Sequence, residues 1–336
     1  MKKTRGTFIL NVKPEISGVY TVVGPKEKFS ELGKYYNLKS DDDKFGESTY
    51  EKAECKMLST AISKVIEKSG LKESDVSALI SGDLLNQIIS ANFAARDFDV
   101  PFIGVYSACS TITECFIIGS MLLNSGNADN VVCATGSHFA TAERQYRYPL
   151  ELGAIRPPQA QWTVTGAGAY LLSSAHSGKP VISAVTIGKV IDFGVTDPNN
   201  MGAAMAPACS NTLARHFKNT KTKPSDYDLI VTGDLGALGS RLLKRLMIKS
   251  GYNVDKNHVD CGELVYNMKE DNFQGGSGAG CGTVVLAGYI YPKLLKREIK
   301  RVLFAATGAL LSTVSSQQGE SIPAISHVVT IEVNND

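Results

Sequence analysis

Short apolar runs rich in β-branched residues alternate along this chain with amphipathic stretches of helical length. Runs of this kind are typical of sheets covered by helices on both faces. The pattern predicts strands in the first half at Leu79–Ser81, Phe102–Tyr106 and Val131–Thr135. It predicts helices over Tyr50–Ser69, Thr111–Asn124, Ser210–Phe217, Ser240–Ser250 and Gly282–Leu295. Ser48 or Thr49 is expected to cap the first helix, and Gly70 to end it. The alternation indicates an α/β fold.

The pattern of apolar runs occurs twice. "VSALISGDLLNQ" and "YDLIVTGDLGALG" are both β-rich runs that end near Gly-Asp-Leu, and "ADNVVCATGSH" and "IKRVLFAATGALLS" both close a buried strand with Ala-Thr-Gly. A weaker pair is "SACSTITECFIIGSMLL" and "GGSGAGCGTVVLAGYIY", in which a turn of small residues opens an apolar helix. The pairs follow the same order, which indicates two copies of one βαβαβ unit. We place an N-terminal half at residues 1–180, with a long excursion at 138–165, and a C-terminal half at 181–336.

Composition and charge exclude several classes of protein. With 336 residues, 43% of them hydrophobic, the chain is long enough to bury a large core. Its net charge of +2 gives no reason to expect a nucleic acid partner. The seven cysteines are dispersed and form no C-x-x-C pair, which predicts a reducing compartment and neither a disulfide framework nor a zinc site. No apolar run reaches the roughly 18 residues of a membrane helix, so any membrane role is expected to be peripheral.

The segment "VYSACSTITE" places Cys109 where a buried strand gives way to an apolar helix. A helix N-terminus lowers the pKa of a thiol and can stabilise an oxyanion beside it. Three interpretations of Cys109 stay open: a small residue in a tight turn, a residue that lines a retained cleft, or a covalent nucleophile. The chemistry therefore depends on what lies opposite the thiol.

Other candidates come from the strand ends and from the central excursion. Asp83 and Asp234 occupy equivalent places in the two repeats, which favours a structural role such as capping the next helix. Asp83 and Asn86 are also candidates for the cleft. His138 follows a strand, and it either contacts a ligand or binds backbone as a loop histidine. The glycine-rich turn that contains Gly276 and Ser277 lacks the spacing of a nucleotide loop.

Two related halves, one of which carries Ala-Cys-Ser at its helix start, resemble the thiolase-like superfamily that includes the ketoacyl synthases. The segment "DPNNMGAAMAPACSNTLARHF" resembles the Met-x-Gly loop and following helix of those enzymes. The blocks "GPKEK", "GDLLNQ", "TAERQYRYP", "TDPNNMG" and "ATGALLS" together resemble the stage V sporulation protein AD family of spore-forming bacteria. The resemblance implies an α/β, thiolase-like duplicated fold with five layers, αβαβα.

The same resemblance implies a function. It predicts a non-catalytic protein that binds dipicolinate, alone or as its calcium complex, for uptake into the developing spore and release in germination. It also implies membrane proteins of the same spore transport system as partners, and a soluble protein peripherally associated with the spore inner membrane. No cofactor is expected.

The partners that a condensing enzyme needs are absent from their expected places. In the ketoacyl synthases the cysteine works with a histidine from the first strand-end loop of the second half, and with an asparagine or second histidine from its glycine-rich turn. Here the loop reads "VTGDLG" (231–236) and the turn reads "QGGSGAGC" (274–281). We therefore predict that this protein is not an enzyme. The alternatives are a Cys109-dependent acyl-transfer or condensing enzyme, and a structural adaptor with a vestigial pocket.

The arginines of the excursion complete the predicted ligand site. Arginine suits bidentate recognition of carboxylates, and aromatic faces stack on a flat ring, so Arg144 and Arg147 among nearby aromatic residues fit a pyridine with two carboxylates. A dimer contact or a solvated loop is the alternative for these arginines. The predicted ligand contacts are Cys109, Asp83, Asn86, His138, Arg144, Arg147, Gly276 and Ser277, and no metal ligand is predicted. A homodimer is expected because the apolar strand "NVVCATG" would otherwise leave an exposed edge.

Overall fold

The computed structural model describes residues 4–146, 156–266 and 274–333. Most of its strands form one continuous run in the order β11-β10-β13-β14-β9-β2-β8-β6-β4-β5, with β1 beside β9 and β3 beside β2. A separate pair is formed by β12 and β7. The strands are β1 (Thr7–Ile9), β2 (Glu15–Val23), β3 (Leu38–Lys39), β4 (Ala78–Gly82), β5 (Phe102–Gly104), β6 (Asn130–Ser137), β7 (Trp162–Thr163), β8 (Gly166–Ser173), β9 (Val181–Thr186), β10 (Leu229–Thr232), β11 (His258–Asp260), β12 (Gly276–Ser277), β13 (Arg301–Ala309) and β14 (Ala324–Glu332).

The long run of strands consists of two equivalent sheets. The order β5-β4-β6-β8-β2 in the first matches β11-β10-β13-β14-β9 in the second, strand for strand along the chain. In each sheet the first three strands of the order are parallel, and the last two pair antiparallel to their neighbours. The two sheets join through β2 and β9 at the single pair Glu15 and Val181. The predicted duplication is confirmed.

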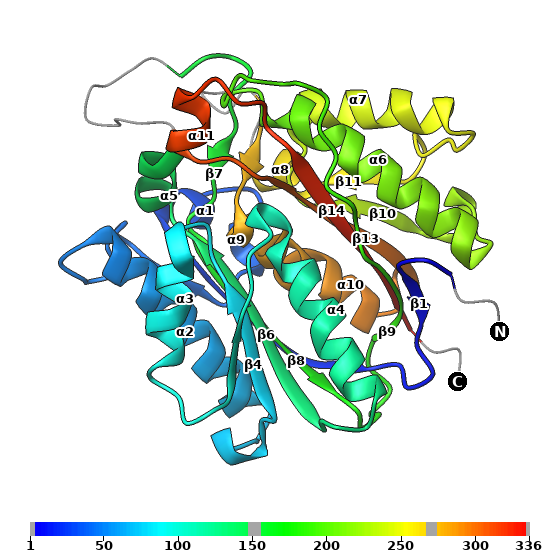
Figure 1. The fold of residues 1–336 in the computed structure, drawn as a ribbon. Coiled ribbons are helices and arrows are strands. Elements are labelled where there is room, and N and C mark those ends of the chain that lie inside the picture. Colours follow the sequence, from blue (N-terminus) through cyan, green and yellow to red (C-terminus); the bar gives the residue numbers. More distant parts are fainter. Residues whose placement is uncertain (1–3, 147–155, 267–273, 334–336) are drawn as a thin grey trace.

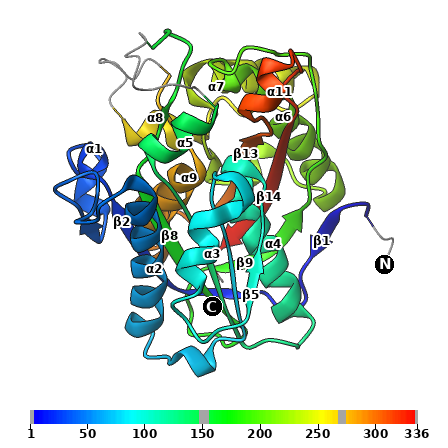
Figure 2. The ribbon, with the colours of Figure 1, turned by 60° about the vertical axis from the view of Figure 1, so that its left-hand side comes forward.

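Helices separate and cover the two sheets, giving the five predicted layers (Figures 1 and 2). One outer layer (α2, α3) packs on the first sheet, the other (α6, α7) packs on the second, and α4 and α9 lie between the sheets. The helices are α1 (Pro25–Lys28), α2 (Tyr50–Lys68), α3 (Ile89–Ala95), α4 (Thr111–Asn124), α5 (Phe139–Tyr146), α6 (Met201–Thr220), α7 (Gly236–Lys249), α8 (Cys261–Val265), α9 (Ala279–Val285), α10 (Tyr291–Leu295) and α11 (Thr313–Gln317).

The central layer explains why α4 is apolar on nearly every side. A helix between two sheets has no face in water, so its polar positions must be few. Phe116 of α4 is fully buried and meets Tyr170 of β8 edge to face, with ring centroids 4.9 Å apart. The Tyr170 hydroxyl donates to the Thr283 carbonyl oxygen of α9 at 2.6 Å. These contacts tie both central helices to the first sheet and fix the start of α4, where Cys109 lies.

Several predicted helix boundaries differ from the structure for identifiable reasons. The predicted Ser210–Phe217 is part of the longer α6, which begins at Met201 and includes Pro207. The predicted Gly282–Leu295 is three pieces, because a π-helical turn at Leu286–Ile290 separates α9 from α10. Pro292 follows that turn and cannot donate a backbone hydrogen bond, which favours a change of helical register before it.

The prediction that "NVVCATG" forms an exposed edge strand is wrong. The strand "NVVCATG" is β6, which is paired on both sides, with β4 and β8. The edge of the first sheet is β5 instead, since it pairs with β4 alone. Within the described ranges, no helix is both long and apolar enough to cross a membrane.

Candidate functional site

A tight turn between β5 and α4 presents Cys109. Ala108, the residue before it, has a left-handed φ of 48°, which is uncommon for a residue with a side chain. The turn is held from inside, because the Thr111 hydroxyl donates to the Ala108 carbonyl oxygen at 2.6 Å and accepts from the Ser107 N–H at 3.1 Å. Strand β13 supports it from the second half: a Cβ on Gly308 would lie 2.2 Å from the Ser107 carbonyl oxygen. The strained backbone is therefore kept in place by both halves.

The group opposite the Cys109 thiol is a carboxyl group. Asp234 follows β10 in the loop where a condensing enzyme would carry its histidine, and its carboxyl group is close enough to the thiol to raise the thiol pKa. Asp234 is buried, and its Oδ1 accepts weakly from the Thr307 N–H at 3.4 Å. Within the described part of the chain, no histidine forms a hydrogen bond with Cys109.

This environment keeps the thiol protonated. Burial raises the pKa of Cys109 well above its ordinary value, and the charge and hydrogen bond of Asp234 raise it further. Burial also raises the pKa of Asp234 well above the usual range of a carboxyl group, and the nearby Asp260 adds to the shift. The N–H groups of Gly278 and Cys109 point toward the sulfur and act in the opposite direction, but their effect is smaller.

The glycine-rich turn contributes only its backbone at Gly278. Gly276 and Ser277 form strand β12, which pairs in parallel with Trp162 and Thr163 of β7. The Gly276 carbonyl oxygen accepts from the Gln161 side chain at 3.1 Å, and the Ser277 side chain is buried. These two predicted ligand contacts therefore lie in a small sheet beside the site.

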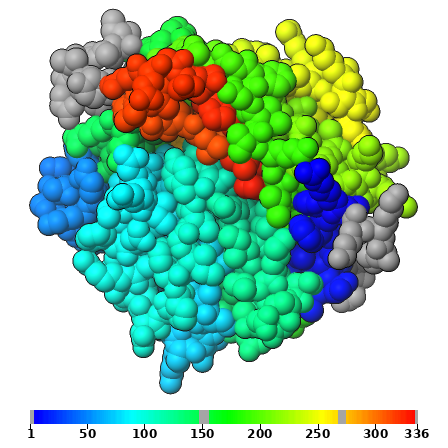
Figure 3. Space-filling model, in the orientation of Figure 1, coloured from blue at the N-terminus to red at the C-terminus, as the bar shows by residue number. Residues whose placement is uncertain are grey.

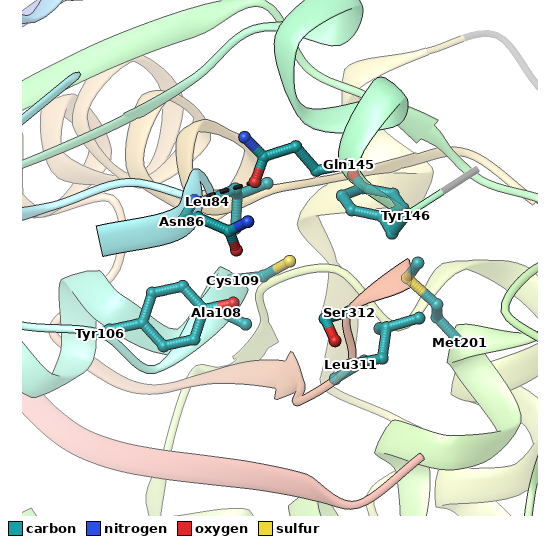
Figure 4. A pocket seen from close by; sticks show the side chains of 11 residues that line it. Leu84, Asn86, Tyr106, Ala108, Cys109, Gln145, Tyr146, Met201, Leu311 and Ser312 are labelled. Atoms are coloured by element: carbon teal, nitrogen blue, oxygen red, sulfur yellow. Dashed lines mark hydrogen bonds between the residues drawn. The ribbon is translucent and has the colours of Figure 1, made fainter. Parts of the chain in front are cut away.

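A small cavity lies in front of Cys109 (Figure 4). Its volume is about 30 Å³, which is room for one or two water molecules. The Asn86 N–H donates to Gln145 Oε1 at 2.9 Å and links the loop after β4 to α5 across the cavity. The lining residues are Leu84, Asn86, Tyr106, Ala108, Cys109, Gln145, Tyr146, Met201, Ala309, Leu311 and Ser312.

Asp83 lies beneath this cavity and does not line it. Its two carboxylate oxygens accept from the N–H groups of Leu85 and Ala91, each at 2.7 Å, which fixes the loop that carries Asn86 to the first turn of α3. The side chain is fully buried, and burial raises the pKa of Asp83 to about 6. Glu54 of α2 is buried nearby, and burial together with the Asp83 charge raises its pKa well above the usual range. The geometry is that of a structural cap.

The other predicted contacts line a second, larger cavity. Helix α5 contributes Gln145 and Tyr146 to the cavity at Cys109, but Phe139, Ala140 and Arg144 to one of about 420 Å³. His138 also lines the second cavity, and its ring is held by backbone: Nδ1 accepts from the Ala140 N–H at 3.1 Å, so Nε2 carries the proton and donates to the Asp43 carbonyl oxygen at 2.7 Å. Arg147 lies outside the described residues.

Sequence reasoning missed several residues that line the Cys109 cavity. Met201 and Ser312 belong to blocks that carried the family resemblance, "TDPNNMG" and "ATGALLS", so the signal was present in the motif. Tyr106, Gln145 and Leu311 come from a strand end, a helix and a loop that only the fold brings together. In the described ranges, no group of three or more His, Cys, Asp or Glu side chains is arranged to hold a metal ion.

Solved structures that resemble this one include condensing enzymes. The 3-oxoacyl-[acyl-carrier-protein] synthase III from Aquifex aeolicus VF5 superposes with a TM-score of 0.54 at 13% identity, over 95% of this chain and 99% of that one. Cerulenin-bound OleA of Xanthomonas campestris superposes with a TM-score of 0.61 at 13% identity, over 98% of this chain and 100% of that one. The predicted thiolase-like fold is thereby confirmed.

Sequence comparison gives the narrower relationship. A family profile described as Stage V sporulation protein AD matches residues 4–332. The stage V sporulation protein AD of Bacillus subtilis (strain 168) is 42% identical over 333 residues, which is 99% of this chain and 98% of that protein. The chain, a thiolase-like fold whose cysteine faces a carboxyl group, belongs to the stage V sporulation protein AD family.

Proposed function

We propose that this sporulation protein uses its thiolase-like fold to bind dipicolinate and does not join acyl groups. The observation that carries the proposal is the pairing of Cys109 with Asp234. A condensing reaction needs a thiolate, a proton acceptor and an oxyanion donor. The Asp234 carboxyl group does not promote the first of these, because its negative charge, when present, opposes a thiolate.

The rate argument supports a binding role. Losing general acid–base assistance typically lowers a rate by about 10²–10⁴, and losing one oxyanion donor lowers it by about 10²–10³. The loop 231–236 holds no histidine, and the turn 274–281 holds no histidine or asparagine. Both losses therefore apply to Cys109.

The dipicolinate assignment rests on the family that the motifs resemble. That family implies uptake of dipicolinate, alone or as its calcium complex, into the developing spore and release in germination. Membrane proteins of the same transport system are the partners that this role requires, and they would hold the protein peripherally at the spore inner membrane. The proposal assigns the transport step across the membrane to those partners and ligand capture to this chain.

Calorimetry and a turnover assay test the proposal together. Titration with dipicolinate, with and without calcium, is expected to give saturable heat at a stoichiometry of one or more per chain. The protein is expected neither to condense nor to hydrolyse acyl thioesters above a Cys109→Ala control. Absence of dipicolinate binding under both conditions would leave the structural adaptor as the better interpretation.

The competing function is acyl transfer by Cys109, which the position of this residue at the start of α4 favours. Its signature is release of free coenzyme A over several turnovers that disappears in Cys109→Ala. Such release would overturn the binding-protein proposal.

A further inference from the structure

We propose that the second cavity, beside α5, is a binding site for a planar aromatic carboxylate. Where dipicolinate is the ligand, this rests on the proposed function above and assigns that ligand a place apart from Cys109. The cavity lies among the start of α1, the loop before α2, α5 and β7, and its lining residues are Lys26, Asp43, Tyr50, His138, Phe139, Ala140, Arg144, Trp162 and Thr165.

Size separates the two cavities. A volume of about 420 Å³ lies within the roughly 300–1,000 Å³ of small-molecule pockets. The space of about 30 Å³ at Cys109 has room for water only, and the contact between Asn86 and Gln145 spans it. The second cavity therefore has enough volume for a pyridine ring with two carboxylates, and the first does not.

Aromatic rings form two walls of the cavity. Phe139 and Trp162 stack on each other with centroids 4.0 Å apart and planes 14° apart, and Tyr50 lies 5.2 Å from the His138 ring. Rings of this kind present flat, apolar faces to an aromatic ligand. His138 itself is neutral, since burial lowers its pKa and both ring nitrogens are engaged with backbone, so it shapes the wall and supplies no charge.

Several cations lie against these rings, and two of them, Lys26 and Arg144, line the cavity itself. Lys26 Nζ lies 4.1 Å from the Trp162 ring centre, and the Arg144 guanidinium lies 5.5 Å from the Tyr50 ring centre. An ammonium and a guanidinium beside aromatic faces match a ligand that carries carboxylates on a flat ring. Arg144 also lies 3.9 Å from Glu51.

The backbone at Lys26 is held in place because the next residue, Glu27, is buried and hydrogen-bonded. Glu27 is fully buried, its Oε1 accepts from the Thr165 N–H at 3.0 Å, and the Tyr266 hydroxyl donates to the same oxygen. These bonds hold α1 against the start of β8 and place Lys26 over the cavity before any ligand arrives. A positioned cation loses less freedom on binding than a free one.

Trp162 provides the readout, because it is the only tryptophan in the chain. Dipicolinate that enters this cavity is expected to change the tryptophan fluorescence in a saturable way, with the same dissociation constant as calorimetry gives. Isophthalate, which has the same shape without the ring nitrogen, is expected to change it as well, since neither cation needs that nitrogen.

Variants separate this site from the Cys109 cavity. Lys26→Met and Arg144→Met are each expected to weaken dipicolinate binding about tenfold or more, as for a lost charged hydrogen bond. Lys249→Met and Arg241→Met remove exposed cations of α7, on the far outer layer, and are expected to leave the dissociation constant within twofold. Asn86→Phe fills the mouth of the Cys109 cavity and is also expected to leave it within twofold.

The possible failures are distinguishable. If dipicolinate binds, but Asn86→Phe abolishes binding and the Lys26 and Arg144 variants do not weaken it, the second-cavity assignment is wrong and the proposed function stands. If dipicolinate gives neither heat nor a fluorescence change while isophthalate binds with the expected dependence on Lys26, the cavity assignment stands and the proposed function fails. If neither compound binds, both fail.

Discussion

At the scale of single residues, the chemistry of this protein depends on the group opposite Cys109. A carboxyl group lies where a condensing enzyme carries its catalytic histidine. A histidine opposite Cys109 would accept its proton, whereas Asp234 shares the buried space and raises the thiol pKa. The sequence could reveal this pairing, because Asp234 directly follows the strand that repeats the one before Asp83. It could not reveal the depth of burial that dominates the shift.

Removing the Asp234 charge is expected to activate Cys109 partially. In Asp234→Asn the carboxyl group no longer opposes a thiolate, so the Cys109 pKa falls and alkylation by iodoacetamide at fixed pH accelerates several-fold. Burial remains the larger cause, so the thiol stays less reactive than an ordinary exposed cysteine. Mass spectrometry of the labelled peptides measures the rate.

Cys55 is the internal control for that experiment. It is half-buried in α2, and the charges that shift its pKa come from Asp97, Arg96, Glu54 and Asp83, not from Asp234. Its labelling rate is therefore expected to stay constant. An unchanged or slower rate at Cys109 in Asp234→Asn would contradict the charge argument.

At the scale of elements, the sequence predicted helix boundaries correctly where a capping residue or a preceding strand marks them. Helix α2 begins at the predicted Tyr50 because the Thr49 hydroxyl accepts from the Lys52 N–H, and α4 spans the predicted Thr111–Asn124. The first nine residues of α6 were missed because Gly202 and Pro207 interrupt its helical pattern, and burial of the segment against α7 and β14 outweighs their cost.

The sequence predicted only part of the candidate site. Cys109 and Asn86 do line one cavity, but Arg144 and His138 line another, because α5 lies between the two and sends successive side chains to each. The sequence placed Arg144 in a long excursion and predicted no helix there, whereas the residue lies on α5. It could not show which cavity its side chain would face, since the walls of both cavities come from elements far apart in the sequence.

Glu27 is expected to make the free energy of unfolding depend on pH. This buried carboxyl group joins α1 to residues beside β8 and α8, and burial raises its pKa to about 7. Because the folded pKa exceeds the unfolded value of 4.5, the unfolded chain releases the proton first, so this group's contribution to the free energy of unfolding falls as pH rises from about 4.5 to 7.

The matched variant Glu27→Gln keeps an acceptor and removes the titration. The difference in unfolding free energy between the variant and the unaltered protein is expected to grow by about 2–3 kcal/mol in favour of the variant between pH 5 and 8. Urea denaturation at the two pH values measures it. A difference that is independent of pH would show that Glu27 does not titrate in this range.

At the scale of the whole molecule, the edge of the first sheet exposes apolar surface. The edge strand β5 carries Ile103 with 37% of its surface exposed, and the neighbouring α3 exposes 46% of Phe93. Cyan atoms of the segment around residue 100 lie uncovered across the face in Figure 3. An unpaired, apolar edge of this kind is the surface that a second strand covers.

We propose that β5 pairs with β5 of a second copy across a two-fold axis. The pairing satisfies the free backbone groups of the edge and buries Ile103 and Phe93, and an isologous contact closes at two subunits. Tyr106, next along the chain, lines the Cys109 cavity, so this interface adjoins its mouth.

Light scattering is expected to give about twice the chain mass of 36.0 kDa at micromolar concentration. Ile103→Lys places a charge in the proposed contact and is expected to weaken association more than tenfold, since an unpaired lysine would have to be desolvated there. Ile248→Lys alters a more exposed apolar residue on the outer helix α7, where 55% of the residue surface is accessible, and should leave the mass unchanged. A monomer in the unaltered protein excludes the dimer, and equal dissociation by both variants would place the interface away from β5.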